Sequence, residues 1–197
     1  MIINGIRLTA KQKLAVADKI WNLSREPNSS LLTETPEEII SIINDGITWV
    51  EMSNGTPRFI VAFMSTPHSK FVEIRMVCNL EPEKILRVKG KRAFLEIIHR
   101  YQEENVSKGE KCLFLTTTNI RMIRVARHAN FQEMTDIRNF LPPNVFNYCC
   151  SYCPPEKTGV KEIGQQLKKC PRFNGEFISN EGRVTNHRQC SAFYKII

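Results

Sequence analysis

The stretch that constrains the fold most is "RVKGKRAFLEIIHRYQ", residues 87–102. Four basic residues surround Gly90, and an amphipathic pattern follows them. The apolar positions of that pattern recur at helical spacing: Ala93, Phe94, Ile97, Ile98 and Tyr101. The stretch predicts a helix that begins at a basic, glycine-containing loop. Such a helix start suits either the phosphates of a cofactor or the backbone of a nucleic acid.

Length and composition are those of a soluble globular protein of one domain, or of one domain with an appendage. The chain has 197 residues, of which 42% are hydrophobic and 24% are charged. The N-terminal "MIINGIRLTAKQK" lacks the order of a signal peptide, so we expect a cytoplasmic protein with mostly reduced cysteines. The net charge of +8 favours an anionic partner without distinguishing nucleic acid from a phosphorylated cofactor.

Two capping boxes predict helix starts near the N-terminus. Thr9 is followed three residues later by Gln12, and Thr35 by Glu38, with Pro36 at the first helical position of the second box. Apolar residues at helical spacing follow both boxes.

Strand patterns follow the second helix. "ITWVEM" and "RFIVAFM" flank Asn54-Gly55, a pair typical of a tight hairpin turn, and "KFVEIRMVC" supplies a third alternating strand. After the helix at residues 87–102, "CLFLTTT" predicts a buried strand, "NIRMIRVARHA" a helix and "FQEMTDI" another strand. The predicted order is β-α-α-β-β-β-α-β-α-β, with parallel strands in its second half.

Residues 1–140 are therefore expected to form one α/β domain, and residues 141–197 a Cys-rich C-terminal extension. The extension holds "GEFIS" and "SAFYKII", two candidate strands that could complete the sheet.

This order of elements resembles the GNAT superfamily of acyl-CoA N-acyltransferases over roughly residues 6–140. Its cofactor loop, Gln/Arg-x-x-Gly-x-Gly/Ala, is matched at four positions by Arg87-Val88-Lys89-Gly90, but Arg92 stands where a small residue is expected. Asn119 leads the next helix, as in the family, and Asn130-Phe131 replaces a Gly-Phe pair, with Asn130 as a left-handed helix cap. The resemblance implies a GNAT-like mixed, mostly antiparallel central sheet flanked by helices.

The resemblance also implies acetyl-CoA or another acyl-CoA as cofactor. Its diphosphate would lie at the start of the central helix, bound by Arg87, Val88, Lys89, Gly90, Lys91 and Arg92, with Asn119 nearby. Its pantetheine arm would lie between the strand that ends near Cys78 and the strand that begins near Cys112. Backbone N–H groups of Met76, Val77 and Cys78 would bind the arm and polarise the thioester carbonyl.

For catalysis, the resemblance points to a glutamate base on the central strands. Glu73 is the best-placed candidate and Glu51 a weaker one, whereas the alternative is that Glu73 simply pairs with a neighbouring arginine. The tyrosine that acts as general acid in the family corresponds to Ala126 in this chain. His128 is a candidate proton donor in its place, or a solvated surface residue. A thiolate, whose pKa is about 8 to 9, can also leave without a proton donor.

The function predicted from the sequence is acyl-CoA-dependent transfer of a small acyl group, such as acetyl, to an amine. The alternative is a catalytically degenerate GNAT-fold binding or structural protein. Either could contact nucleic acid through its basic helices. The second helix carries one basic stripe, which is either a contact surface for the phosphate backbone or a charged face in solvent: Arg121, Arg124, Arg127 and His128.

The cysteines of the extension are candidate zinc ligands. Cys150 and Cys153 have the C-x-x-C spacing of a zinc knuckle, and Cys170 and Cys190 complete a set of four. Free or buried thiols, and disulfide or redox roles, are the alternatives. Cys78 and Cys112 lie in predicted strands and are expected to be small core residues.

Overall fold

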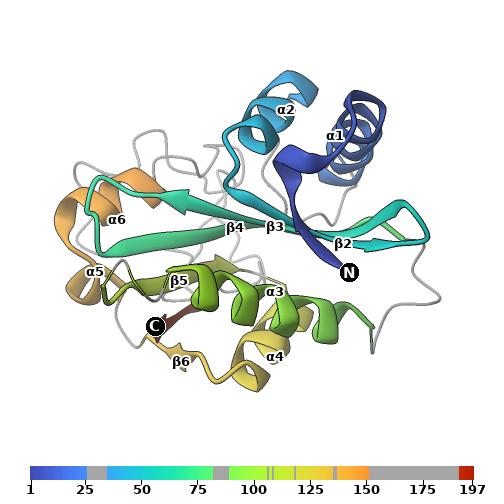
Figure 1. Ribbon diagram of the computed structural model, residues 1–197. Helices are drawn as coiled ribbons and strands as arrows, with labels where there is room; N and C mark the ends of the chain where they lie inside the picture. The colour runs from blue at the N-terminus through green and yellow to red at the C-terminus, as the bar shows by residue number, and fades with distance from the viewer. Residues whose placement is uncertain are drawn as a thin grey trace, which may run out of the picture. The chain divides into compact units, whose positions relative to one another are not determined.

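The computed structural model describes residues 1–25, 35–81, 89–105, 107, 109–117, 119–134, 137–150 and 191–197. Within these ranges the strands form one seven-stranded sheet of order β1-β2-β3-β4-β5-β7-β6 (Figure 1). β4 and β5 pair in parallel, whereas β1 with β2, β2 with β3, β5 with β7, and β6 with β7 pair antiparallel. The strands are β1 (Ile2–Asn4), β2 (Thr48–Ser53), β3 (Thr56–Ser65), β4 (Phe71–Asn79), β5 (Cys112–Thr117), β6 (Gln132–Glu133) and β7 (Ser191–Ile196).

The order of helices and strands follows the predicted one as far as β6. Six α-helices are described, preceded by a 3-10 turn at Gly5–Arg7: α1 (Ala10–Ser24), α2 (Pro36–Asn44), α3 (Lys89–Asn105), α4 (Ile120–His128), α5 (Ile137–Phe140) and α6 (Pro143–Cys150). The predicted α/β class and the mixed, mostly antiparallel sheet are confirmed. None of the helices in the described ranges has both the length and the apolar character of a membrane-spanning segment.

The chain divides into two compact units, each described by itself. The first comprises Met1–Met64, Ile74–Glu110 and Ile197, and the second comprises Ser65–Glu73 and Lys111–Ile196. β4 therefore contributes Phe71–Glu73 to the second unit and its remaining residues to the first. The sequence-based boundary at residue 140 stays a prediction.

In the first unit, α1 and α2 lie on one side of the strands and α3 on the other (Figure 1). Both predicted capping boxes are present. The Thr9 hydroxyl accepts a hydrogen bond from the Gln12 N–H at 3.2 Å, and the Gln12 side chain accepts one from the Thr9 N–H at 2.9 Å. Thr35 and Glu38 form the same pair of bonds at the start of α2.

The β2–β3 hairpin has the turn that its sequence predicts. Asn54 and Gly55 both have positive φ angles, 48° and 76°, and Ser53 pairs with Thr56 across the turn. The register then shifts between Glu51 and Met52, next to Pro57 on the partner strand. Proline cannot donate to the ladder, which is why a bulge tolerates it there.

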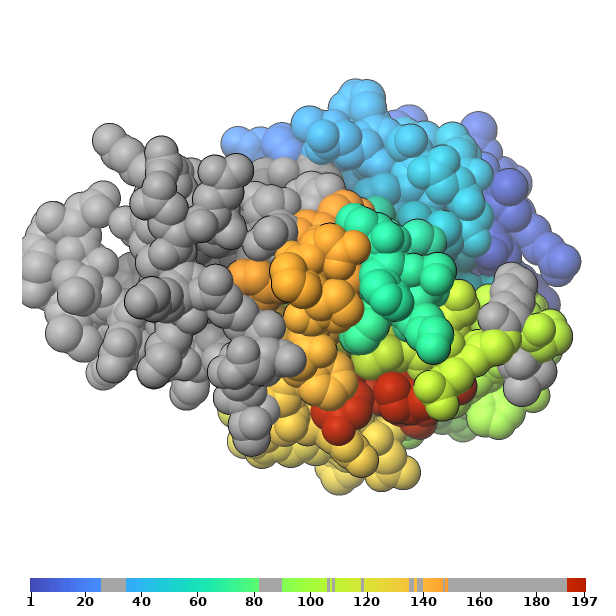
Figure 2. All heavy atoms as spheres, turned by 90° about the vertical axis from the view of Figure 1, so that its left-hand side faces the viewer, coloured from blue at the N-terminus to red at the C-terminus, as the bar shows by residue number. Residues whose placement is uncertain are grey.

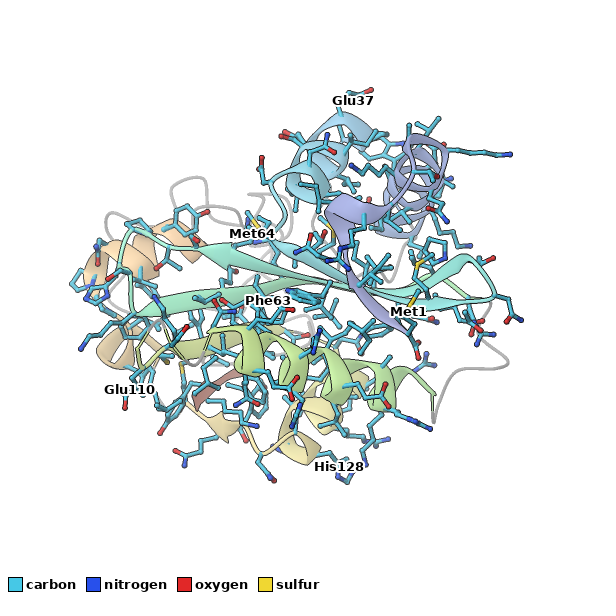
Figure 3. All side chains as sticks on the ribbon, in the orientation of Figure 1. Met1, Glu37, Phe63, Met64, Glu110 and His128 are labelled. Carbon is cyan, nitrogen blue, oxygen red and sulfur yellow. The ribbon has the colours of Figure 1, made fainter. Side chains whose placement is uncertain are left out.

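β3 is buried on both faces, because helices cover both of them. Ile60 and Ala62 pack in the core beneath α1 and α2, together with Val50 of β2. On the other face, the Phe63 ring stacks on the Tyr101 ring of α3 with centroids 3.9 Å apart (Figure 3). Successive side chains of a strand point to opposite faces, and both faces of β3 are covered, so five consecutive residues, 59–63, are buried.

The core of the second unit joins strands β5 and β7 to the two short helices. Phe114, Met134, Leu141, Val145 and Ala192 belong to one buried cluster. Figure 2 shows α6 in orange beside β7 in red, in agreement with that cluster. β7 pairs with β5 from Ser191↔Thr117 to Ile196↔Cys112, so the predicted strand "SAFYKII" lies inside the sheet. "GEFIS" lies outside the described residues.

Residues 131–150 differ from the expectations in two places. The strand predicted for "FQEMTDI" comprises only Gln132 and Glu133, because Met134 and Ile137 turn into the buried cluster and Ile137 opens α5. Residues 144–197 show little obvious periodicity in the sequence, yet Pro143 begins α6, whose Val145 and Phe146 face the core. Proline at the first helical position was a sequence signal for that helix.

The stacked Tyr101 predicts that part of the folding stability is lost at alkaline pH. Burial raises the pKa of Tyr101 above its ordinary value of 10.0. The neutral phenol is therefore favoured in the folded state, and its stabilising effect is present below pH 10 and is lost as the pH rises through the folded pKa. We expect the stability difference between wild type and Tyr101→Phe to be constant up to about pH 9 and to shift in favour of the variant by pH 11. Urea unfolding at both pH values measures it, and a constant difference would contradict the assignment.

Candidate active site

β4 carries two buried charged residues on one face. Glu73 is 5% exposed and Arg75 is 7% exposed, and residues two apart in a strand point to the same side of the sheet. A carboxylate and a guanidinium are rarely buried without a partner, because burying an isolated charge is costly. Both residues do engage in interactions. Whether Glu73 serves as a base or pairs with a neighbouring arginine stays a prediction.

One residue after Arg75, the backbone of β4 leaves the extended conformation. Met76 has a φ of 52°, in the left-handed region that an unbranched non-glycine residue seldom occupies. Its side chain and that of Cys78 lie in the core of the first unit with Ile60 and Ala62. Since these side chains are committed to packing, it is the backbone of Met76–Cys78 that can meet a ligand.

The end of β4 is fastened to β3. The Leu80 N–H donates to the Arg58 carbonyl at 2.8 Å, and Arg58 forms an ion pair with Glu81. The Asn79 side chain accepts from the Glu81 N–H and donates to the Glu81 carbonyl, both at 3.2 Å. These contacts fix the strand end directly after the left-handed residue.

The described part of α3 begins at Lys89, at the predicted cofactor loop. Arg87 and Val88 lie outside the described residues, as does the side chain of Lys89. A Cβ on Gly90 would meet only the Phe59 ring, at 3.6 Å, which is an ordinary contact.

The Arg92 side chain turns outward along the helix. Its Nε lies 2.5 Å from Glu96 Oε1, and the side chain is 81% exposed. The hydrogen bond to Glu96 and that carboxylate's charge raise the pKa of Arg92, and Glu51 adds to the effect. The bulky residue at the small-residue position of the loop is thus directed toward Glu96.

Asn119 begins α4 in the second unit. Its side-chain oxygen accepts a hydrogen bond from the Arg121 N–H at 2.9 Å, and its own N–H donates to the Thr117 hydroxyl at 3.0 Å. Asn119 is therefore a helix cap that also ties α4 to the end of β5. Its predicted part in cofactor binding stays a prediction.

The predicted left-handed cap at the other end of α4 is confirmed. Asn130 has a φ of 58°. Its N–H donates to the Arg127 carbonyl at 3.2 Å, and the Phe131 N–H donates to the Ala126 carbonyl at 3.1 Å. These two bonds are the Schellman motif. They set the path of the chain from α4 into β6.

The two candidate positions for a proton donor differ in exposure. Ala126 is fully buried and offers no titratable group. His128 is exposed in the last turn of α4 and points outward in Figure 3. Glu73, Asn119 and His128 belong to the second unit, whereas Met76–Cys78 and Gly90–Arg92 belong to the first.

The predicted zinc ligands fall mostly outside the described residues. Cys153, Cys170 and Cys190 lie there, and of Cys150 only the backbone is described, at the end of α6. Among the residues that the structure does describe, no group of three or more His, Cys, Asp or Glu side chains could hold a metal ion. Zinc binding stays a prediction. Cys78 and Cys112 are buried thiols, as expected.

Comparison with known proteins identifies the fold. No protein-family model and no curated protein sequence matches the chain significantly. Solved structures do match. A Mycobacterium tuberculosis protein in complex with CoA aligns over 100% of this chain and 99% of its own, with a TM-score of 0.57 and 16% identity. A GNAT-family acetyltransferase from Bacillus anthracis aligns over 100% and 92%, with a TM-score of 0.51 and 12% identity.

N-acetylglutamate synthase from Neisseria gonorrhoeae, complexed with coenzyme A and N-acetyl-glutamate, matches 72% of this chain with a TM-score of 0.54 and 19% identity. The match spans only 30% of that longer protein. The chain has the GNAT fold. At these identities the likeness concerns the fold alone.

Sequence reasoning missed two features of β4 in this GNAT fold. The buried Arg75 had a signal, since the strand pattern already placed it on the same face as Glu73. The left-handed Met76 had none, because methionine has no preference for positive φ. Only the packing around β4 selects that conformation.

The cap at Asn130 predicts opposite effects of two substitutions. Asn130→Gly should leave the Schellman motif intact and change the free energy of unfolding by only a few tenths of a kcal/mol, since glycine adopts positive φ without strain. Asn130→Ala should cost about 1 kcal/mol because alanine is strained there. Urea unfolding of both variants measures the effect, and equal stability of the two would contradict the cap.

Proposed function

We propose that the protein is an acyl-CoA-dependent N-acyltransferase that transfers a small acyl group, such as acetyl, from a thioester to an amine. The observation that carries the proposal is the left-handed Met76 within β4. Strained backbone at a non-glycine residue persists only where the surroundings impose it, and it is concentrated at functional sites. Here it falls on the residues from which thioester-polarising amides were expected.

The chemistry assigned to this backbone is stabilisation of an oxyanion. When the amine nitrogen attacks the thioester carbonyl, negative charge develops on the carbonyl oxygen. A preorganised N–H group of Met76–Cys78 would donate to that oxygen, and loss of one such donor typically costs about 3 kcal/mol of activation free energy. A side-chain substitution leaves these backbone groups in place, so the packing that holds Met76 matters more than its thioether.

The cofactor diphosphate is assigned to the start of α3. Helix N-termini present unpaired N–H groups and the positive end of the helix dipole, which together bind phosphate. α1, α2 and α4 have side-chain caps at their N-termini, supplied by Thr9, Thr35 and Asn119. α3 begins within the basic stretch Lys89-Gly90-Lys91-Arg92, whose positive charge favours an anion at that position.

Glu73 is assigned as the base. It would accept a proton from the attacking amine, directly or through water, as the new C–N bond forms and the C–S bond breaks. Carboxylates serve as general bases, and Glu73 lies on β4, the strand that also carries Met76–Cys78. The departing CoA thiolate, whose pKa is near 8.5, either takes a proton from His128 or leaves unassisted.

Two coenzyme A complexes among the matched structures agree with this assignment, as they show that chains of this fold hold the cofactor. The second candidate function is a GNAT-fold binding protein without catalysis. It is favoured by Ala126, which is buried and non-titratable where the family's tyrosine acid is expected. Acetyl-CoA binding without turnover would identify that alternative.

Gly90→Ala separates the cofactor site from fold stability. The substitution should raise the stability of the free protein by about 0.5–1 kcal/mol, since alanine is the better helix former and its Cβ finds room at the Phe59 ring. Acetyl-CoA at 100 times its Kd should stabilise wild type by about 2.7 kcal/mol, and the variant by clearly less. Thermal unfolding with and without acetyl-CoA measures both effects.

Two outcomes would count against the cofactor site. One is a wild-type melting temperature that millimolar acetyl-CoA leaves unchanged. The other is an equal acetyl-CoA shift in wild type and in Gly90→Ala.

Glu73→Gln tests the base. We expect kcat for acetyl transfer to fall by about 10²–10⁴-fold while the acetyl-CoA melting shift is retained, because the substitution removes proton transfer and leaves the cofactor site. Glu51→Gln, the matched control on β2, should keep kcat within a few-fold. Release of free CoA thiol in the presence of a panel of amines provides the assay. Wild-type kcat in Glu73→Gln would exclude Glu73 as the base.

A further inference from the structure

The excess of positive charge is confined to the second part of the chain. Residues 1–110 hold 15 Lys and Arg against 14 Asp and Glu, so they are nearly neutral. Residues 111–197 hold 13 Lys and Arg against 6 Asp and Glu. Nearly all of the net charge of +8 thus belongs to the segment that supplies most of the second unit. Such asymmetry between halves of a chain is typical of proteins that bind nucleic acid.

In the described part of that segment, the positive charge gathers on α4. The helix "IRMIRVARH" contains three arginines, one histidine and no acidic residue. Its buried side is formed by Ile123 and Ala126, and its basic side chains are all exposed: Arg121, Arg124, Arg127 and His128. Among the described side chains, Glu133 forms an ion pair with Arg127 at 2.8 Å, and Arg121 also takes part in an interaction, yet all four basic side chains stay exposed. Most of the basic face therefore faces solvent.

The basic residues of α3 are arranged differently. Arg92 pairs with Glu96, and Arg100 lies 3.4 and 3.5 Å from Glu103 and Glu104. Both arginines of α3 thus lie close to carboxylates of the same helix. Of the two basic helices, we therefore expect α4 to be the one that contacts nucleic acid.

We propose that the exposed face of α4 binds the phosphate backbone of a nucleic acid, independently of base sequence. Arginine suits this partner because its planar guanidinium forms two parallel hydrogen bonds to a phosphate. The helix contains no aromatic residue on which a base could stack, so contacts to phosphate rather than to bases are expected. This surface does not depend on the acyltransferase assignment.

The size of the face sets the expected number of contacts. A helix of nine residues is about 13 Å long, and phosphates along one strand of a duplex are spaced by about 3.4 Å of helix axis. Three or four phosphates can therefore be reached. Each neutralised phosphate contributes about −0.9 to the slope of log K against log salt concentration, so the slope expected for α4 is about −3.

The experiment uses the full chain and a fluorescent random-sequence duplex DNA of about 20 base pairs, titrated between 50 and 200 mM salt. Wild type should bind with a slope of about −3 or steeper. Arg124→Gln should weaken binding several-fold and reduce the magnitude of the slope by about 1. Arg100→Gln, which removes the same charge from α3, should leave affinity and slope unchanged. Circular dichroism verifies that both variants are folded.

Several outcomes would overturn the proposal. Absence of binding at 50 mM salt would do so, and so would equal losses in Arg124→Gln and Arg100→Gln. Displacement of the DNA by saturating acetyl-CoA would assign α4 to the cofactor instead. Binding of poly-glutamate as tightly as DNA of equal charge would assign it to an acidic protein.

Discussion

The left-handed backbone at Met76 is the constraint on which the proposed chemistry depends. A methionine gains nothing intrinsically from positive φ, so its surroundings must hold it there. On one side its thioether packs beneath α1 and α2 with Ile60 and Ala62, and its burial opposes any rotation that would expose it. Beyond it, the contacts of Leu80 and Glu81 with Arg58 fasten the strand end. The core of the first unit thereby maintains an irregular strand that could present backbone amides to a thioester.

The same unit holds α3 through the interior face of the helix. That face is anchored by Phe94, Ile97 and Ile98, which are almost completely buried, and by the stack of Tyr101 on Phe63. Burial of this kind contributes about 25 cal/mol for each Å² of apolar surface. The proposed function assigns the first amides of α3 to the cofactor diphosphate, whereas the side chains of Thr9 and Thr35 cap α1 and α2.

Most of the fold could be predicted from the sequence because its elements carry local signals. Capping boxes, the Asn54-Gly55 turn and strand alternation are encoded within a few residues of where they act. The position of β7 between β5 and β6 could not be predicted, since that pairing joins residues about 80 positions apart. The length of the strand after Asn130 was predicted incorrectly for a related reason. Met134 and Ile137 pack in the buried cluster and do not continue the strand.

The residues of the candidate site could be predicted from the sequence only in part. Glu73, Gly90 and Asn119 could be chosen from pattern and resemblance, but the burial of Arg75 and the strain at Met76 come from packing. At two positions this chain differs from the pattern of the family that it resembles. Arg92 pairs with Glu96 along α3, and buried Ala126 offers a carbonyl to the Schellman motif where the family has a phenol.

Residue-resolved amide hydrogen exchange, with and without CoA, tests the central claim most directly. Saturating CoA should slow exchange at Gly90 and Lys91 and within Met76–Cys78, while the capped amides of Gln12 and Glu38 exchange as before. Exchange at both groups of amides that CoA leaves unaltered, although the cofactor is bound, would contradict the account.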